Sequence, residues 1–104
     1  MIRKAFVMSV YPGKEEEYKR RHNPIWEELA ELFKERRVSN YSIFLEPKTG
    51  QLFGYAEIED EEQWESIAQT EVCQKWWKSM SHLMPSLEDH SPISASLSEV
   101  FHLD

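Results

Sequence analysis

The residue in this chain best suited to chemistry is His22, because an imidazole gives and takes protons near neutral pH. Tyr18 precedes it by four residues. In a helix that spacing projects both side chains from the same face. The pair therefore suggests acid–base chemistry, although a histidine that only makes a structural hydrogen bond in the core would give the same pattern.

Two adjacent tryptophans, Trp76 and Trp77, form the second candidate feature. On a helix their side chains point about 100° apart, so both cannot enter one core. One interpretation is that they serve the core and a subunit contact. The other is a carbohydrate platform, because indole faces stack on the C–H faces of pyranose rings. Tyr41, which we expect to point inward from a strand, could supply a hydroxyl to such a sugar.

Metal and nucleotide chemistry have little support in the sequence. The four histidines lack the spacing of metal ligands, and a chain with 3 glycines contains no phosphate-cradling loop. Cys73 adjoins an apolar stretch, where a buried thiol is expected, with a Cys–His nucleophilic pair as the alternative. We therefore expect no metal and no cofactor.

The elements that must position these residues follow from hydrophobic periodicity and turn signals. We expect a strand over 2–10, a helix over 14–36, strands over 38–46 and 51–58, a second helical region from 59 to Pro85, and a weaker strand over 97–103. Within the first helix Pro24 removes a backbone donor, which predicts a kink or a restart with Asn23 as its cap.

This βαββαβ order predicts an α+β, ferredoxin-like fold with a four-stranded antiparallel sheet. Two helices on one face leave the other face uncovered. The strand over 51–58 is apolar on both faces, with Leu52, Ala56 and Ile58 on one and Phe53 and Tyr55 on the other. A second copy of the chain is the expected cover, which predicts a homodimer.

Length and charge limit the possible classes of protein. The chain has 104 residues and a mass of 12.4 kDa, as expected for a single domain over 1–104. With 12 basic against 19 acidic residues the net charge is −7, so nucleic acid is a poor partner. One cysteine cannot form an internal disulfide, and the first apolar run is too short for a signal peptide or membrane span. We expect a soluble cytoplasmic protein.

Four segments carry a resemblance to a known family: YPGKEEEYKRRHNPIWEEL, NYSIFL, LFGYAEIEDEEQW and QKWWKSM. Together with the rest of the chain they resemble the L-rhamnose mutarotases. The resemblance implies a ferredoxin-like domain that forms a dimeric α/β barrel and exchanges the α and β anomers of L-rhamnose without a cofactor. It implies that His22 is the proton donor and that Tyr18, Tyr41, Trp76 and Trp77 bind the sugar. The base is less well defined, with Tyr18 or a water that it holds as the first candidates.

Two rival functions stay open at this point. The same architecture hosts cofactor-free monooxygenases and lactone isomerases, so the fold alone does not choose a reaction. A non-catalytic dimeric binding module, in which the two tryptophans lie in the interface, is the other alternative.

Overall fold

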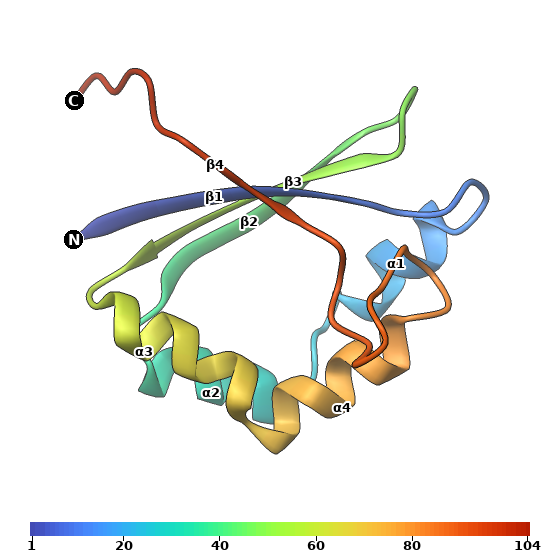
Figure 1. The fold of residues 1–104 in the computed structure, drawn as a ribbon, viewed down its shortest axis with the longest axis horizontal. Helices are drawn as coiled ribbons and strands as arrows, with labels where there is room; N and C mark the ends of the chain where they lie inside the picture. The colour runs from blue at the N-terminus through green and yellow to red at the C-terminus, as the bar shows by residue number, and fades with distance from the viewer.

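The computed structural model describes all residues 1–104, and its elements follow the predicted βαββαβ order. The elements are β1 (Ile2–Ser9), α1 (Glu15–Arg21), α2 (Glu27–Glu35), β2 (Ser39–Glu46), β3 (Gln51–Ile58), α3 (Glu61–Ser66), a 3₁₀ turn (Ile67–Gln69), α4 (Glu71–Met80) and β4 (Ala95–Leu97). The four strands form one sheet in the order β2-β3-β1-β4, with all named pairs antiparallel. All helices lie on one side of this sheet (Figure 1). The predicted α+β, ferredoxin-like architecture is confirmed.

The first helical region is broken at Pro24, as predicted. A proline inside a helix lacks the amide hydrogen and crowds the carbonyl four residues earlier, so α1 and α2 are separate. The prediction that Asn23 caps the second helix is wrong. Trp26 precedes α2, and the Asn23 side-chain amide instead donates to the Lys19 carbonyl at 2.8 Å. The Asn23 side chain is thus engaged by a carbonyl in the last turn of α1, where the regular helical partners are missing, and α2 begins only after Trp26.

Two side-chain caps divide the second helical region. The Asp60 carboxylate accepts a hydrogen bond from the Glu62 amide at 3.2 Å and begins α3. The Thr70 hydroxyl accepts one from the Cys73 amide at 3.3 Å and begins α4. Such caps satisfy amides that have no partner in the first turn of a helix. The region therefore folds as two short helices with a 3₁₀ turn between them.

The last strand is shorter and earlier than predicted. The expected strand over 97–103 is wrong, because β4 covers only Ala95–Leu97, where it pairs with β1. Residues 98–104 have no regular structure and are exposed. The apolar side chains that suggested a strand are Val100, Phe101 and Leu103, which contact no core in this chain. Their spacing resembled a half-buried strand, but nothing in the chain covers them.

The core lies between the sheet and the helices. Leu52, Ala56 and Ile58 of β3 are almost fully buried there, as the alternation along this strand predicted. Gly54 shares their face, and a Cβ at this position would lie 2.3 Å from the Phe6 ring. Only glycine permits Phe6 to approach the strand so closely.

The opposite face of the sheet has no covering layer (Figure 1). Two rows of side chains cross it, Phe44–Phe53–Val7–Ala95 and Ser42–Tyr55–Ala5–Leu97. Phe44 is 67% exposed and Phe53 37% exposed. Among the helices on the other side of the sheet, none combines the length and apolar content that crossing a membrane requires.

Candidate active site

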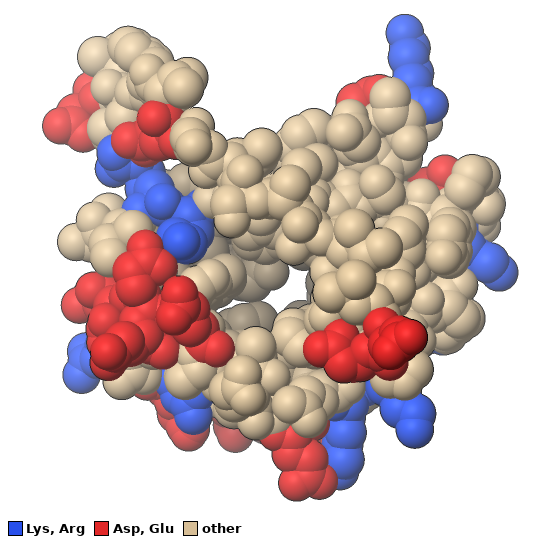
Figure 2. Space-filling view, in the orientation of Figure 1, with Lys and Arg blue, Asp and Glu red and all other residues tan.

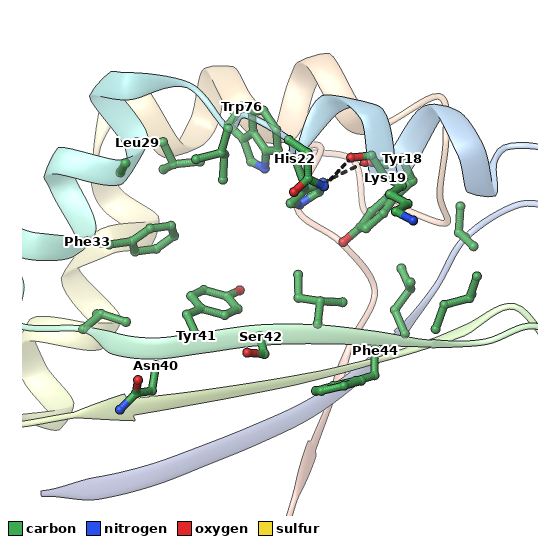
Figure 3. Close-up of a pocket in the computed structure, with 18 of the residues that line it drawn as sticks. Tyr18, Lys19, His22, Leu29, Phe33, Asn40, Tyr41, Ser42, Phe44 and Trp76 are labelled. Atoms are coloured by element: carbon green, nitrogen blue, oxygen red, sulfur yellow. Dashed lines mark hydrogen bonds between the residues drawn. The ribbon is translucent and has the colours of Figure 1, made fainter.

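A cavity of about 910 Å³ lies between the α1–α2 segment and β2. Figure 2 shows the molecule hollowed at this level, between the sheet and the helices, with mostly uncharged atoms around the opening. Its walls include the residues drawn in Figure 3, among them Tyr18, His22, Leu29, Phe33, Tyr41 and Trp76. The charged side chains of the lining come from Glu15, Glu16, Lys19 and Lys34. This size suits one small ligand, since ligand pockets typically have about 300–1,000 Å³.

The orientation of His22 is set by the end of α1. His22 is the C-terminal cap residue of this helix, and its Nδ1 lies 2.9 Å from the Tyr18 carbonyl oxygen. A carbonyl oxygen only accepts hydrogen bonds, so Nδ1 carries the hydrogen and donates. In the neutral ring Nε2 is consequently the nitrogen with the free lone pair. No hydrogen bond within the chain occupies Nε2.

Aromatic rings enclose the imidazole on two sides. The Tyr18 ring stacks on it with centroids 4.4 Å apart, which agrees with the predicted four-residue spacing. Trp76 meets it edge to face at 5.2 Å. Burial lowers the pKa of His22, and the hydrogen bond to the Tyr18 carbonyl offsets part of this shift. The pKa therefore lies below its ordinary value, so the ring is mostly neutral at pH 7.

Two phenol hydroxyls face the cavity from opposite walls, Tyr18 from the helices and Tyr41 from β2 (Figure 3). Neither hydroxyl has a hydrogen-bond partner in the chain. Every fully buried polar side-chain atom does have such a partner, so these two hydroxyl oxygens are not fully buried and are accessible from the cavity. Burial raises the pKa of both phenols above the ordinary value. Both stay protonated at neutral pH, which makes Tyr18 a poor candidate for the base.

Neighbouring rings hold Tyr41 in place. Phe33 of α2 meets it edge to face at 5.2 Å, and Phe6 of β1 does so at 6.1 Å. The Phe6 ring can adopt this position because Gly54 leaves room for it. The inward orientation of Tyr41 predicted from strand alternation is thus confirmed.

The structure separates the two adjacent tryptophans. Trp76 lines the cavity, and its indole nitrogen points toward it in Figure 3. Trp77 is not part of the lining and packs partly buried against the hydrophobic core. The structure therefore brings together Tyr18, His22, Tyr41 and Trp76, and it leaves out Trp77, whose part in ligand binding stays a prediction.

Two aromatic neighbours of the site were missed by sequence reasoning. Trp26 contacts the Trp76 ring edge to face at 5.1 Å, and Phe33 contacts Tyr41. Phe33 falls within the helix predicted over 14–36, where an apolar residue is expected to pack in the core, and the break at Pro24 removes Trp26 from any helical pattern. A useful signal was available for Trp26, because a large ring close to a helix break needs a packing partner.

The single cysteine takes no part in this arrangement. Cys73 is buried in the core and free of any disulfide. Burial raises the pKa of its thiol to about 12. A protonated, enclosed thiol is a poor nucleophile, which argues against the Cys–His alternative.

The chain is similar to known proteins in both sequence and structure. A sequence model of one protein family, described as L-rhamnose mutarotase, matches residues 3–103. An L-rhamnose mutarotase from Opitutus terrae is 65% identical over 104 residues and one from Bacillus subtilis 56% identical, each with full coverage of both chains. A crystal structure of an L-rhamnose mutarotase from Formosa agariphila superposes with a TM-score of 0.93 at 36% identity, covering 100% of both chains.

A second solved structure shares this fold but comes from a protein described by a different function. It is a putative antibiotic biosynthesis monooxygenase from Nitrosomonas europaea, similar with a TM-score of 0.65 at 12% identity over 97% of this chain and all of that one. At this identity only the fold is shared. The full-length relatives favour neither the monooxygenase nor the binding-module alternative. The chain belongs to the L-rhamnose mutarotase family, whose members are isomerases that act on a carbohydrate.

Proposed function

We propose that this protein, acting as one domain over residues 1–104, interconverts the α and β anomers of L-rhamnopyranose, with His22 as the group that moves the proton. The observation that carries this proposal is the position of His22, with its free Nε2 in the wall of a mostly uncharged cavity between two open phenol hydroxyls. A neutral sugar matches such a site because it needs hydrogen bonds and ring stacking rather than a charged partner.

The reaction requires a proton to leave one oxygen and reach another. The anomeric hydroxyl loses its proton, the bond from the anomeric carbon to the ring oxygen breaks, and the ring oxygen gains a proton. Rotation within the open-chain aldehyde and addition to the other carbonyl face then give the second anomer. No electron is gained or lost overall, so acid–base groups suffice.

We infer that His22 handles this proton in both directions. Its lowered pKa keeps Nε2 unprotonated at neutral pH, ready to accept the hydroxyl proton. The resulting imidazolium is then the proton donor to the ring oxygen. Both oxygens are bonded to the same carbon, so one nitrogen close to that carbon can reach each of them. The Nδ1 hydrogen bond to the Tyr18 carbonyl fixes the ring throughout.

The other predicted residues would bind the sugar. Tyr18 and Tyr41 supply protonated hydroxyls from opposite walls, and Trp76 supplies an indole ring and an N–H donor. Because L-rhamnose is a 6-deoxy sugar, its methyl group is apolar and suits the rings around the cavity. Trp77 belongs to the proposed binding set through the family resemblance, and because it packs against the core it would contribute indirectly, through the position of α4.

We also propose that the protein is a homodimer that acts in the cytoplasm, where it supplies rhamnose anomers to rhamnose metabolism. The support for the dimer is the uncovered sheet face, on which the Phe44–Phe53–Val7–Ala95 row lies exposed to water. A second copy placed on this face would remove it from solvent. The support for the cytoplasm is the single, unpaired cysteine.

The test is anomer exchange measured by proton NMR saturation transfer on L-rhamnose at equilibrium, with and without the protein. We expect the exchange rate to rise in proportion to protein concentration. An exchange rate equal to the spontaneous rate would contradict the proposed function. Oxygen uptake with a quinol-like substrate would then support the monooxygenase alternative, and tight sugar binding without exchange would support a binding module.

A further inference from the structure

The contact between the His22 and Trp76 rings joins two elements that local sequence does not bring together. His22 ends α1, and Trp76 lies in the middle of α4. Helix α1 has only 7 residues, and isolated helices of this length are marginal in water. Tertiary contacts must therefore hold the end of α1 at α4.

One side chain, that of Arg21, makes that connection, and each of its three guanidinium nitrogens has a neighbour: one within α1 and two at the end of α4. The Arg21 Nη1 donates to the Ser79 carbonyl at 2.6 Å, and its Nε donates to the Glu17 carboxylate at 2.7 Å. Its Nη2 lies 3.4 Å from Nε2 of His82. Arg21 immediately precedes His22, so the guanidinium links the last turn of α1 to the last turn of α4.

Electrostatics favours this link at both ends. Ser79 lies in the last turn of α4, where carbonyls lack helical partners and where a positive charge is favourable. Glu17 is a charged acceptor, because its hydrogen bonds with Arg20 and Arg21 lower its pKa to about 2. Hydrogen bonds between charged groups are shorter and stronger than neutral ones. The Arg21 side chain is also about 30% exposed, so solvent screens it less than a free surface charge.

The neighbouring arginine provides a natural contrast. Arg20 pairs with the same Glu17, through its Nε at 3.1 Å and through Nη2. However, its side chain is 73% exposed, and it makes no hydrogen bond to α4. The two arginines share charge, helix and carboxylate partner, and they differ in the bond to Ser79.

We propose that Arg21 is a positioning residue, which holds His22 against Trp76 by tying the end of α1 to the end of α4. This inference rests on the proposed role of His22 in proton transfer. Small displacements of a reacting group reduce rates strongly, by up to about a hundredfold for 1 Å. Substrate binding by Tyr41 and Trp76 should be affected less than proton transfer by His22.

The experiment compares Arg21→Ala with Arg20→Ala. For Arg21→Ala we expect kcat of anomer exchange to fall by about tenfold to a hundredfold with little change in KM, because proton transfer loses its geometry. For Arg20→Ala we expect kcat close to that of the wild type. A loss of folded protein would also lower the apparent kcat of a variant. Thermal unfolding of Arg21→Ala and Arg20→Ala is therefore recorded alongside the kinetics.

A direct structural readout separates this proposal from the proposed function. Nuclear Overhauser effects between the His22 and Trp76 rings should weaken in Arg21→Ala and persist in Arg20→Ala. Equal ring contacts in the two variants, or equal kcat, would overturn the positioning role whatever reaction the site performs. Failure of the proposed function would instead be seen in the wild-type protein, as an exchange rate equal to the spontaneous rate, and failure of the proposed His22 role as full activity in a variant that lacks His22.

If Arg21→Ala does not fold, Arg21→Lys is used as the test variant in its place. Lysine keeps the charge and the aliphatic stem, but a single ammonium cannot reproduce the planar fork toward Glu17 and Ser79. We expect a partial loss of kcat at an unfolding temperature close to that of Arg20→Ala. A kcat for Arg21→Lys equal to that for Arg20→Ala would also contradict the inference.

Discussion

Both faces of the sheet carry apolar side chains, but the surroundings of the two faces differ. On the inner face Leu52, Ala56 and Ile58 are buried under the helices, whereas on the outer face Phe53 is 37% and Phe44 67% exposed. The inner face is covered incompletely: the cavity lies over β2, where α1 and α2 are separated at Pro24. The comparison teaches that the helical layer builds the site by leaving one strand only partly packed, and that nothing in this chain covers the outer face.

The largest expected effect is in the helical layer over the inner face, at His22. His22→Ala should lower kcat by about 10²–10⁴-fold, the usual contribution of acid–base catalysis, while sugar binding is kept. Saturation transfer gives the rate, and titration of L-rhamnose followed by tryptophan fluorescence gives the affinity. An unchanged exchange rate would remove His22 from the mechanism. The cavity over the inner face would then not be shown to contain the catalytic group.

The pH dependence of the rate sharpens the assignment of Nε2. Burial lowers the pKa of His22, and the neutral ring is the form that accepts the first proton. The rate should therefore be constant around pH 7 and fall about tenfold per unit only below the lowered pKa, at a pH under the ordinary value of about 6.5. Exchange rates measured from pH 4.5 to 8 would test this. A rate that rises as His22 becomes protonated would show the opposite starting state.

Gly54 tests how closely the inner face must pack. In Gly54→Ala the new Cβ would meet the Phe6 ring at 2.3 Å and force it to move. We expect a loss of about 1–3 kcal/mol in the free energy of unfolding, as for other overpacked cores, together with weaker sugar binding through a displaced Tyr41. Urea unfolding measures the first effect. As a control, Ala5→Gly on the outer face of β1 should cause no change in sugar binding.

A smaller effect separates the two tryptophans. Trp76→Phe should weaken sugar binding by about 0.5–1.5 kcal/mol, the net value of one hydrogen bond, because the indole N–H facing the cavity is lost. Trp77→Phe should bind the sugar almost normally, since Trp77 lies outside the cavity lining. The KM values for L-rhamnose of the two variants show which tryptophan contacts the sugar. A larger effect at Trp77 would mean that the sugar contacts residues beyond this cavity.

The smallest effect on catalysis is expected on the outer face. Phe53→Lys places a charge in the centre of the proposed dimer interface and should shift the protein toward monomer. The exchange rate per folded chain should stay close to that of the wild type, because Phe53 does not line the cavity. Light scattering during size-exclusion chromatography reports the mass. A wild-type protein that is already monomeric would contradict the homodimer.

Local sequence determined most of the fold. Alternation assigned the inner residues of β3 and the inward orientation of Tyr41 in β2, and the proline rule placed the break at Pro24. The Tyr18–His22 pair was also predictable, because residues four apart share a helical face whatever the rest of the chain does. The last strand failed because residues 98–104 have an apolar pattern that no other part of this chain covers.

Only the tertiary structure decided which groups complete the site. The contact of His22 with Trp76, the choice of Trp76 over Trp77 for the cavity wall, and the link from Arg21 to Ser79 all depend on how α1 meets α4. Periodicity describes which face of an element is apolar, but the register between two helices depends on side-chain shape and on hydrogen bonds between elements distant in the chain. The orientation of the imidazole has the same origin, since its free nitrogen follows from a hydrogen bond to a backbone oxygen.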